Sequence, residues 1–251
     1  MLPTRLLIAS LSSLLFCPAA WSIDKEALSA AISGADREII DYARDESRKP
    51  VEVLDFLGIE PGMSVLDVYA AGGYYTFILS KAVGPSGKVY AQNTPRGLRF
   101  VEDRQDISQG EALEAKIVRG NLVNVTHLVQ RLENLSIDPE SLDAIMVVQI
   151  LHDNYNPNPG RALQMLEQLK ALLKPGGIIG VIDHAGEPGR ENRRFHRMEK
   201  SQAIEVAKAA GLIVIGDSDL LHNPNDKHDR SIFDPLLARN TDRFLLKLQK
   251  P

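Results

Sequence analysis

The sequence predicts an α/β domain built as a three-layer sandwich, with helices on both faces of a mostly parallel, seven-stranded sheet. Apolar runs of strand length alternate with helical patterns over 59–251, which is typical of this architecture. The run 142–148 is apolar at nearly every position, as expected of a strand buried on both faces. The last two strand patterns, 212–215 and 244–248, form a late pair that predicts one antiparallel edge strand.

Composition narrows the class of protein. The 251 residues suit one domain of ordinary size. A hydrophobic content of 44% and a charged content of 25% are those of a globular protein. The net charge of −4 argues against a nucleic-acid-binding surface. The sequence has no Gly-x-Ser-x-Gly elbow of the α/β-hydrolases and no Walker phosphate loop.

The first 22 residues have the layout of a secretory signal peptide. Arg5 gives a basic start, an apolar core covers 6–16, and Ala20 and Ser22 stand at the −3 and −1 positions of a cleavage site. We expect cleavage after Ser22 and export to the periplasm or out of the cell. An uncleaved anchor and a mistaken start codon are the alternatives, although the apolar core is short for a membrane span.

Cleavage would leave a mature domain of residues 23–251. It would remove Cys17, the only cysteine, and a chain without thiols suits an oxidising compartment. Losing the one charged residue of this segment, Arg5, changes the net charge from −4 to −5. Within the mature domain we expect N-terminal helices over 23–58 and the sheet-containing core over 59–251.

The elements follow in order from local patterns. Apolar residues at roughly helical spacing predict one or two helices in 23–48, and Pro50 suits the first turn of a helix over 51–57. The core is expected to contain, in turn, a strand at 65–68, a turn at 70–73, a helix at 74–83, strands at 88–92 and 116–119 with a helix at 98–115 between them, the strand 142–148, a polar loop at 149–158, a helix at 161–173, the strand 178–182, a helix at 201–210, and the last two strands.

Several motifs in this order resemble the class I methyltransferases that use S-adenosylmethionine. The resemblance covers about residues 51–250 and implies a Rossmann-like sandwich, S-adenosylmethionine as cofactor and methyl transfer to a small acceptor. The motifs are Glu60-Pro61-Gly62 before Val65-Leu66-Asp67-Val68, Ala71-Gly72-Gly73, Val89-Tyr90-Ala91 before Asn93, Ser141-Leu142-Asp143-Ala144-Ile145, and Leu173-Lys174-Pro175-Gly176-Gly177.

A narrower set of segments looks like a group of bacterial, often secreted proteins described as predicted methyltransferases. These segments are Gly72-Gly73-Tyr74-Tyr75-Thr76, Asp183-His184, Arg194-Phe195-His196-Arg197-Met198, Asp219-Leu220-Leu221 and Thr241-Asp242-Arg243-Phe244. The resemblance implies a small-molecule acceptor as the partner. From the net charge we expect no nucleic-acid partner, and from the short apolar core of the leader we expect no stable membrane span after cleavage. The resemblance predicts no oligomeric state.

The chain departs from the family pattern at three positions. The usual fingerprint is acidic-x-Gly-x-Gly-x-Gly, and here Tyr69 and Ala71 replace its first two glycines. Tyr69 either turns away from the pocket or stacks on the ligand. Asn93 replaces an acid that binds both ribose hydroxyls in many members. These departures leave a second hypothesis open: a secreted binding or scaffold protein that keeps the fold without catalysis.

Residues that follow the strands are the cofactor candidates, because ligands of this architecture bind at the carboxyl ends of the strands. For each candidate the alternative is a structural role as a cap or a turn former. The resemblance and the strand ends together indicate Asp67, Tyr69, Gly72, Gly73, Asn93, Asn121 and Gln149.

The histidines near the same strand ends are the catalytic candidates. His152 is the best candidate for a general base, because the ordinary pKa of histidine is near neutral, and Asp153 is placed to orient it. Asp183 and His184 end the predicted fifth strand, and His196 follows on a basic segment. The spacing of these residues includes no His-x-His or His-x-x-x-His pair, so the sequence alone predicts no metal site.

Overall fold

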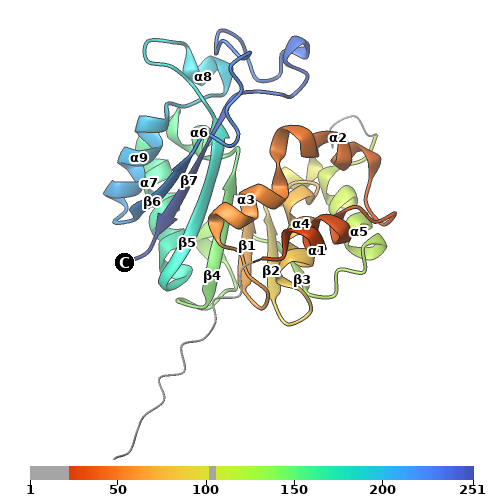
Figure 1. Cartoon of the computed structure of the whole chain (residues 1–251). Helices are drawn as coiled ribbons and strands as arrows, with labels where there is room; N and C mark the ends of the chain where they lie inside the picture. Colours follow the sequence, from red (N-terminus) through yellow and green to blue (C-terminus); the bar gives the residue numbers. More distant parts are fainter. Residues whose placement is uncertain (1–22, 102–105) are drawn as a thin grey trace, which may run out of the picture.

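A seven-stranded sheet forms the centre of the molecule, in the order β3-β2-β1-β4-β5-β7-β6 (Figure 1). The structure is a computed structural model that describes residues 23–101 and 106–251. β7 runs antiparallel to both β5 and the edge strand β6, and the other neighbours are parallel. The strands are β1 (Ser64–Val68), β2 (Lys88–Asn93), β3 (Val125–Val129), β4 (Leu142–Val148), β5 (Leu173–His184), β6 (Ile213–Ser218) and β7 (Arg243–Gln249).

The predicted mixed sheet is thereby confirmed, and the structure adds the place of the opposing strand, which lies one position in from the edge. Helices cover both faces (Figure 1). The α-helices are α1 (Lys25–Ile32), α2 (Ile39–Arg48), α3 (Pro50–Leu57), α4 (Tyr74–Val83), α5 (Gln109–Arg119), α6 (Leu151–Tyr155), α7 (Pro159–Leu172), α8 (Asn192–Phe195) and α9 (Lys200–Ala209).

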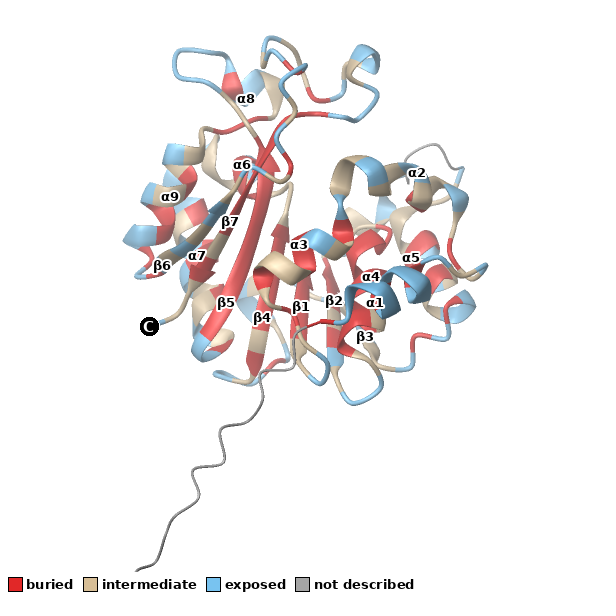
Figure 2. Cartoon of the chain, viewed as in Figure 1, coloured by how far each residue is buried: buried red, intermediate tan, exposed pale blue. Residues whose placement is uncertain are grey.

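Alternation along the central strands separates two apolar layers. Met146 of β4 faces α1, α3 and α4, whereas its neighbour Ile145 faces α7 and α9. Successive strand residues point to opposite faces, so one apolar run supplies both layers. Figure 2 shows β1, β4 and the carboxyl half of β5 as largely buried. Both layers therefore hold the sheet rigidly beneath the loops at its carboxyl end.

The third strand is the element that the sequence places wrongly. Residues 116–119 belong to α5, and β3 comes later, at Val125–Val129. Ser108 opens α5 with a capping box in which Glu111 returns the hydrogen bond. The side chain of Lys116 is buried on this helix and pairs with Asp41. The capping box and the ion pair stabilise the helix, and their contribution outweighs the preference of the segment's β-branched residues for a strand.

Two other boundaries differ from the sequence patterns. The helix expected at 98–115 begins only at Gln109, and a short 3₁₀ turn, Gly97–Arg99, precedes it. The loop expected at 149–158 contains the short helix α6. The predicted signal peptide lies outside the described residues. Within 23–101 and 106–251, no helix has the length and apolar character to cross a bilayer.

The order of the strands positions the site. From β1 the chain proceeds outward through β2 to β3, and then returns to place β4 on the other side of β1. The carboxyl ends of β1 and β4 therefore border the point where the strand order reverses, and ligands of open α/β sheets bind in the crevice outside this point.

Candidate active site

A cavity of about 400 Å³ opens at the carboxyl ends of β1, β4 and β5, a volume within the range of small-molecule sites. Its described lining comes from α2, the end of β1 with the turn after it and the start of α4, Val101 and the start of α5, the ends of β4 and β5, and the loop that precedes β7. Of the residues predicted from the sequence, Asp67, Tyr69, Gly72, Gln149 and His184 lie on its wall.

The turn after β1 keeps the conformation of a glycine turn although two glycines are replaced. Tyr69 and Ala71 both have φ of 51°, in the left-handed region that glycine adopts most easily. Two side chains from the end of β2 hold the turn. The Tyr69 N–H donates to Oε1 of Gln92 (3.0 Å), and the Ala71 N–H donates to Oδ1 of Asn93 (2.9 Å).

Asn93 thus acts on the turn. Its Nδ2 also donates to the carbonyl of Ala71 at 3.2 Å, so both polar atoms of the amide are used, and the residue is 2% exposed. Neither Asn93 nor Asn121 is among the described residues that line the cavity. Asn121 lies in the turn between α5 and β3, at the amino end of that strand. Its assignment rested on the strand expected at 116–119, and that strand is absent.

Gly73 is required by packing. It has φ of 82° and caps α4, and a Cβ atom there would lie 2.6 Å from Cδ1 of the buried Leu113. The described cavity wall includes Gly72 and not Gly73. The alternative of a tight structural turn therefore accounts for Gly73, while Gly72 lies on the cavity wall and stays a candidate for ligand contact.

Charged side chains of both signs line the cavity. Asp67 is buried and accepts a hydrogen bond from Oγ1 of Thr76 (2.7 Å). Burial raises the pKa of Asp67 to about 7, against the opposing effects of the Thr76 hydrogen bonds and the charge of Arg48. Arg44 and Arg48 of α2 and Arg239 also line the cavity. Among the described residues, the wall therefore offers the carboxylate of Asp67 for a cationic group and guanidinium groups for an anionic one.

His184 is the histidine that faces the cavity. Its Nδ1 lies 2.7 Å from Oγ1 of Thr241, which is also on the wall. Its pKa is well below the ordinary value because of burial, reinforced by the charges of His152 and nearby arginines. The ring is therefore neutral near pH 7, as a proton acceptor must be. Gln149 joins this side of the wall, with its N–H donating to the carbonyl of Ile182 (2.7 Å).

His152 lies behind that wall, at the start of α6. Nδ1 of His152 is 2.7 Å from Oδ1 of Asp183, and the His152 N–H donates to Oδ2 of the same carboxylate (2.8 Å). Burial lowers the pKa of His152, but Asp183 and Asp153 outweigh it and raise the pKa to about 10. An imidazole that carries a proton at neutral pH does not suit the role of general base, so the structure favours His184 over His152.

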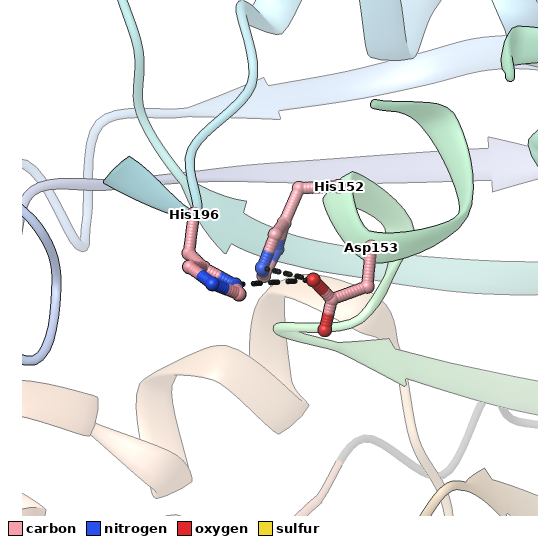
Figure 3. Close-up of side chains that lie close together, drawn as sticks. All are labelled: His152, Asp153 and His196. Atoms are coloured by element: carbon pink, nitrogen blue, oxygen red, sulfur yellow. Dashed lines mark hydrogen bonds and ion pairs between the residues drawn. The ribbon is translucent and has the colours of Figure 1, made fainter. Parts of the chain in front are cut away.

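His196 completes a cluster at the edge of the site (Figure 3). It follows α8, and its Nδ1 is 3.2 Å from Oδ1 of Asp153, which comes from α6. The His152 ring lies 5.8 Å from the ring of His184 and 5.7 Å from that of His196, between centroids. All four predicted catalytic residues, His152, Asp183, His184 and His196, therefore form one connected group, although their roles differ.

Solved methyltransferase structures have the same arrangement of strands and helices. A methyltransferase from Aquifex aeolicus that depends on S-adenosylmethionine superposes with a TM-score of 0.63 at 20% identity, over 91% of this chain and 99% of the other. An arsenic(III) S-adenosylmethionine methyltransferase from Chlamydomonas reinhardtii gives a TM-score of 0.55 at 16% identity, over 89% and 72% of the two chains. This chain has the class I methyltransferase fold.

Sequence similarity supports the same fold over a shorter stretch. A demethylmenaquinone methyltransferase from Lactococcus lactis is 31% identical over 127 residues, or 51% of this chain and 44% of the relative. The chain thus spans about half the length of the curated relatives that it matches. No known protein-family profile matches the chain.

Sequence reasoning missed two parts of this methyltransferase-fold cavity. Arg44 and Arg48 belong to the predicted N-terminal helices, and Phe233 and Arg239 come from the segment between the last two predicted strands; neither region had offered a candidate residue. Only the fold brings these segments over the strand ends. The one available clue was Thr241, which begins one of the segments resembling the secreted group.

Proposed function

We propose that the protein transfers a methyl group from S-adenosylmethionine to a small acceptor in this cavity. The observation that carries the proposal is the turn after β1: Tyr69 and Ala71 keep the left-handed conformation of the missing glycines, and side chains of β2 hold it at the wall of a cavity of ligand size. A left-handed φ at a residue other than glycine costs free energy, and such strain clusters at ligand sites.

The cavity fits the charges of the cofactor. S-adenosylmethionine supplies a methyl group on a positively charged sulfur, next to an amino acid moiety. Asp67 is the carboxylate available to the cationic groups, and Arg48 is placed for the methionine carboxylate. Gln109 lines the cavity, whereas Asn93 is engaged with the turn, so Gln109 takes the contact with ribose that an acid makes in other members.

His184 serves the acceptor. Its ring lines the cavity and Thr241 holds its Nδ1, which leaves Nε2 as the nitrogen to accept a proton from the acceptor. Methyl transfer needs an in-line approach to the methyl group more than strong proton transfer. A neutral imidazole at the wall can orient the acceptor through a hydrogen bond and accept its proton.

Apolar side chains at the cavity favour an acceptor with an apolar part. Phe233 and Val101 line the cavity and are 55% and 68% exposed. Relatives from Lactococcus lactis and Staphylococcus aureus are demethylmenaquinone methyltransferases, so soluble naphthoquinol analogues are the first acceptors to test. Release of S-adenosylhomocysteine by the wild type, with loss of at least about tenfold in the His184→Ala variant, would support the assignment. Equal rates in both proteins would contradict the role of His184.

For location, we propose that residues 1–22 direct export and are removed after Ser22. The support is the sequence pattern: Arg5, the apolar core 6–16, and small residues at the cleavage positions. Mass spectrometry of the N-terminus in fractionated cells tests this. A periplasmic or secreted chain that begins at Ile23 would agree with the proposal, and an intact N-terminus in the cytosolic fraction would contradict it.

A further inference from the structure

Three side chains at the edge of the cavity are arranged as metal ligands. His152, Asp153 and His196 each offer one ligand atom, and these atoms all lie within 4.8 Å of one another (Figure 3). Asp153 Oδ1 is 3.2 Å from Nε2 of His152 and 3.2 Å from Nδ1 of His196. Residues 152 and 196 are far apart in the sequence, so no short sequence motif of metal ligands indicates the cluster.

A second observation points to a missing ligand. Nε2 of His152 is buried and has no hydrogen-bond partner among the described residues, although Asp153 is within ion-pair distance. A buried polar atom without a partner is costly and rare in native proteins. The other nitrogen, Nδ1, is held by the fully buried carboxylate of Asp183 at 2.7 Å. A carboxylate behind a histidine is the usual support of a metal-binding imidazole, because it fixes the ring and its tautomer.

We propose that His152, Asp153 and His196 bind a divalent transition-metal ion, with zinc as the best match. Two ligand atoms about 2.1 Å from a zinc ion lie about 3.4 Å apart at the tetrahedral angle. Both separations of 3.2 Å are close to this value. Small rotations of the half-exposed His196 and Asp153 side chains would complete the triangle.

The donor set selects the class of ion. Two imidazole nitrogens and one carboxylate suit zinc and its neighbours, whereas magnesium and calcium require mostly oxygen ligands. The carboxylates of Asp153 and Asp183 supply negative charge against a dication. Three protein ligands with one side open to solvent leave a coordination position for water or a substrate atom, since Asp153 and His196 side chains are 46% and 40% exposed.

The ion would sit beside the acceptor cavity. The His152 ring touches His184, and the His196 ring lies 5.0 Å from that of Phe233, between centroids. His184 and Phe233 both line the cavity. The metal site itself does not depend on methyl transfer, so it stands or fails separately from the proposed function.

Titration of zinc chloride into the untagged, chelator-treated full chain tests the site. Cys17 is first replaced by Ser, because the only thiol would otherwise compete for zinc. We expect one tightly bound zinc ion per chain, no comparable binding of magnesium, and affinity at least about tenfold weaker in His196→Ala and in Asp153→Asn. His222→Ala is the matched control: it removes another part-exposed histidine that pairs with an aspartate, Asp242, and should leave the affinity unchanged.

X-ray absorption of the zinc-loaded protein separates ligation from a purely structural effect. The spectrum should indicate two imidazole ligands in the wild type and one in His196→Ala. Absence of stoichiometric zinc binding would overturn the proposal, as would equal weakening by His222→Ala or an imidazole count that His196→Ala does not change. Calorimetry with S-adenosylmethionine on the same samples tests the proposed function independently.

Discussion

The role of Asn93 gives a sharp prediction, because the structure assigns it to the turn and the family pattern assigns that position to ribose. In Asn93→Asp, one carboxylate oxygen still accepts from the Ala71 N–H. The other carboxylate oxygen faces the carbonyl of Ala71 and cannot donate to it, whereas in the wild type Nδ2 of Asn93 donates to this carbonyl at 3.2 Å. The residue is 2% exposed. A lost hydrogen bond and a buried, unpartnered carbonyl should lower the free energy of unfolding by about 2 to 3 kcal/mol.

The same change should weaken cofactor binding. If about 1.4 kcal/mol of that loss must be regained to restore the turn when cofactor binds, the affinity for cofactor drops roughly tenfold. Urea denaturation at pH 7 measures the first effect and calorimetry measures the second. Asn121→Asp is the control, since Asn121 is exposed with φ of 46° and its substitution should stay within about 0.5 kcal/mol. If Asn93→Asp were as stable as the control, or bound cofactor more tightly than the wild type, the assignment of Asn93 to the turn would be refuted.

Three further predictions follow from the same geometry. Ala71→Gly should stabilise the protein by about 1 kcal/mol in urea denaturation, because it relieves the left-handed φ, while Ala70→Gly should destabilise it; a loss of stability in both would contradict the strain. Asp67 has a pKa near 7 in the folded state, above its value of 3.8 in model compounds, so the folded state binds the proton more tightly. The free energy of unfolding should therefore fall by about 2 to 3 kcal/mol between pH 5 and pH 8, relative to that of Asp67→Asn. Parallel pH profiles of stability in the wild type and in Asp67→Asn would contradict this. Cofactor affinity should rise over the same range, because a cationic ligand favours the ionised carboxylate; a flat affinity profile in the wild type would argue against Asp67 as its partner.

Much of the fold follows from short-range patterns. The helix over 74–83 and the strand over 142–148 are found where the sequence predicts them, since each has an unbroken apolar pattern between clear turns. The segment 116–119 fails because its β-branched residues suit either element, and a capping box eight residues earlier decides the outcome. That decision is made at the start of the helix, beyond the reach of a local strand pattern.

The site is less predictable because distant segments build it. Residues at the carboxyl ends of β1, β4 and β5 reach the cavity as expected, including Asp67, Gln149 and His184. The sequence cannot show that the amide of Asn93 turns back to Ala71, or that His152 is enclosed by two aspartates. Those outcomes depend on side-chain direction and on burial, which set the pKa of each group and decide which histidine can accept a proton.

Calorimetric titration of the full chain with S-adenosylmethionine measures directly whether this cavity binds the cofactor. We predict saturable binding of one cofactor per chain. Gly72 lies on the cavity wall, so Gly72→Arg should abolish this binding, whereas Ala171→Arg, which places the same side chain at an exposed position of α7, should preserve it. No heat from the wild type at millimolar cofactor, or equal binding by both variants, would contradict the assignment of this cavity as the cofactor site.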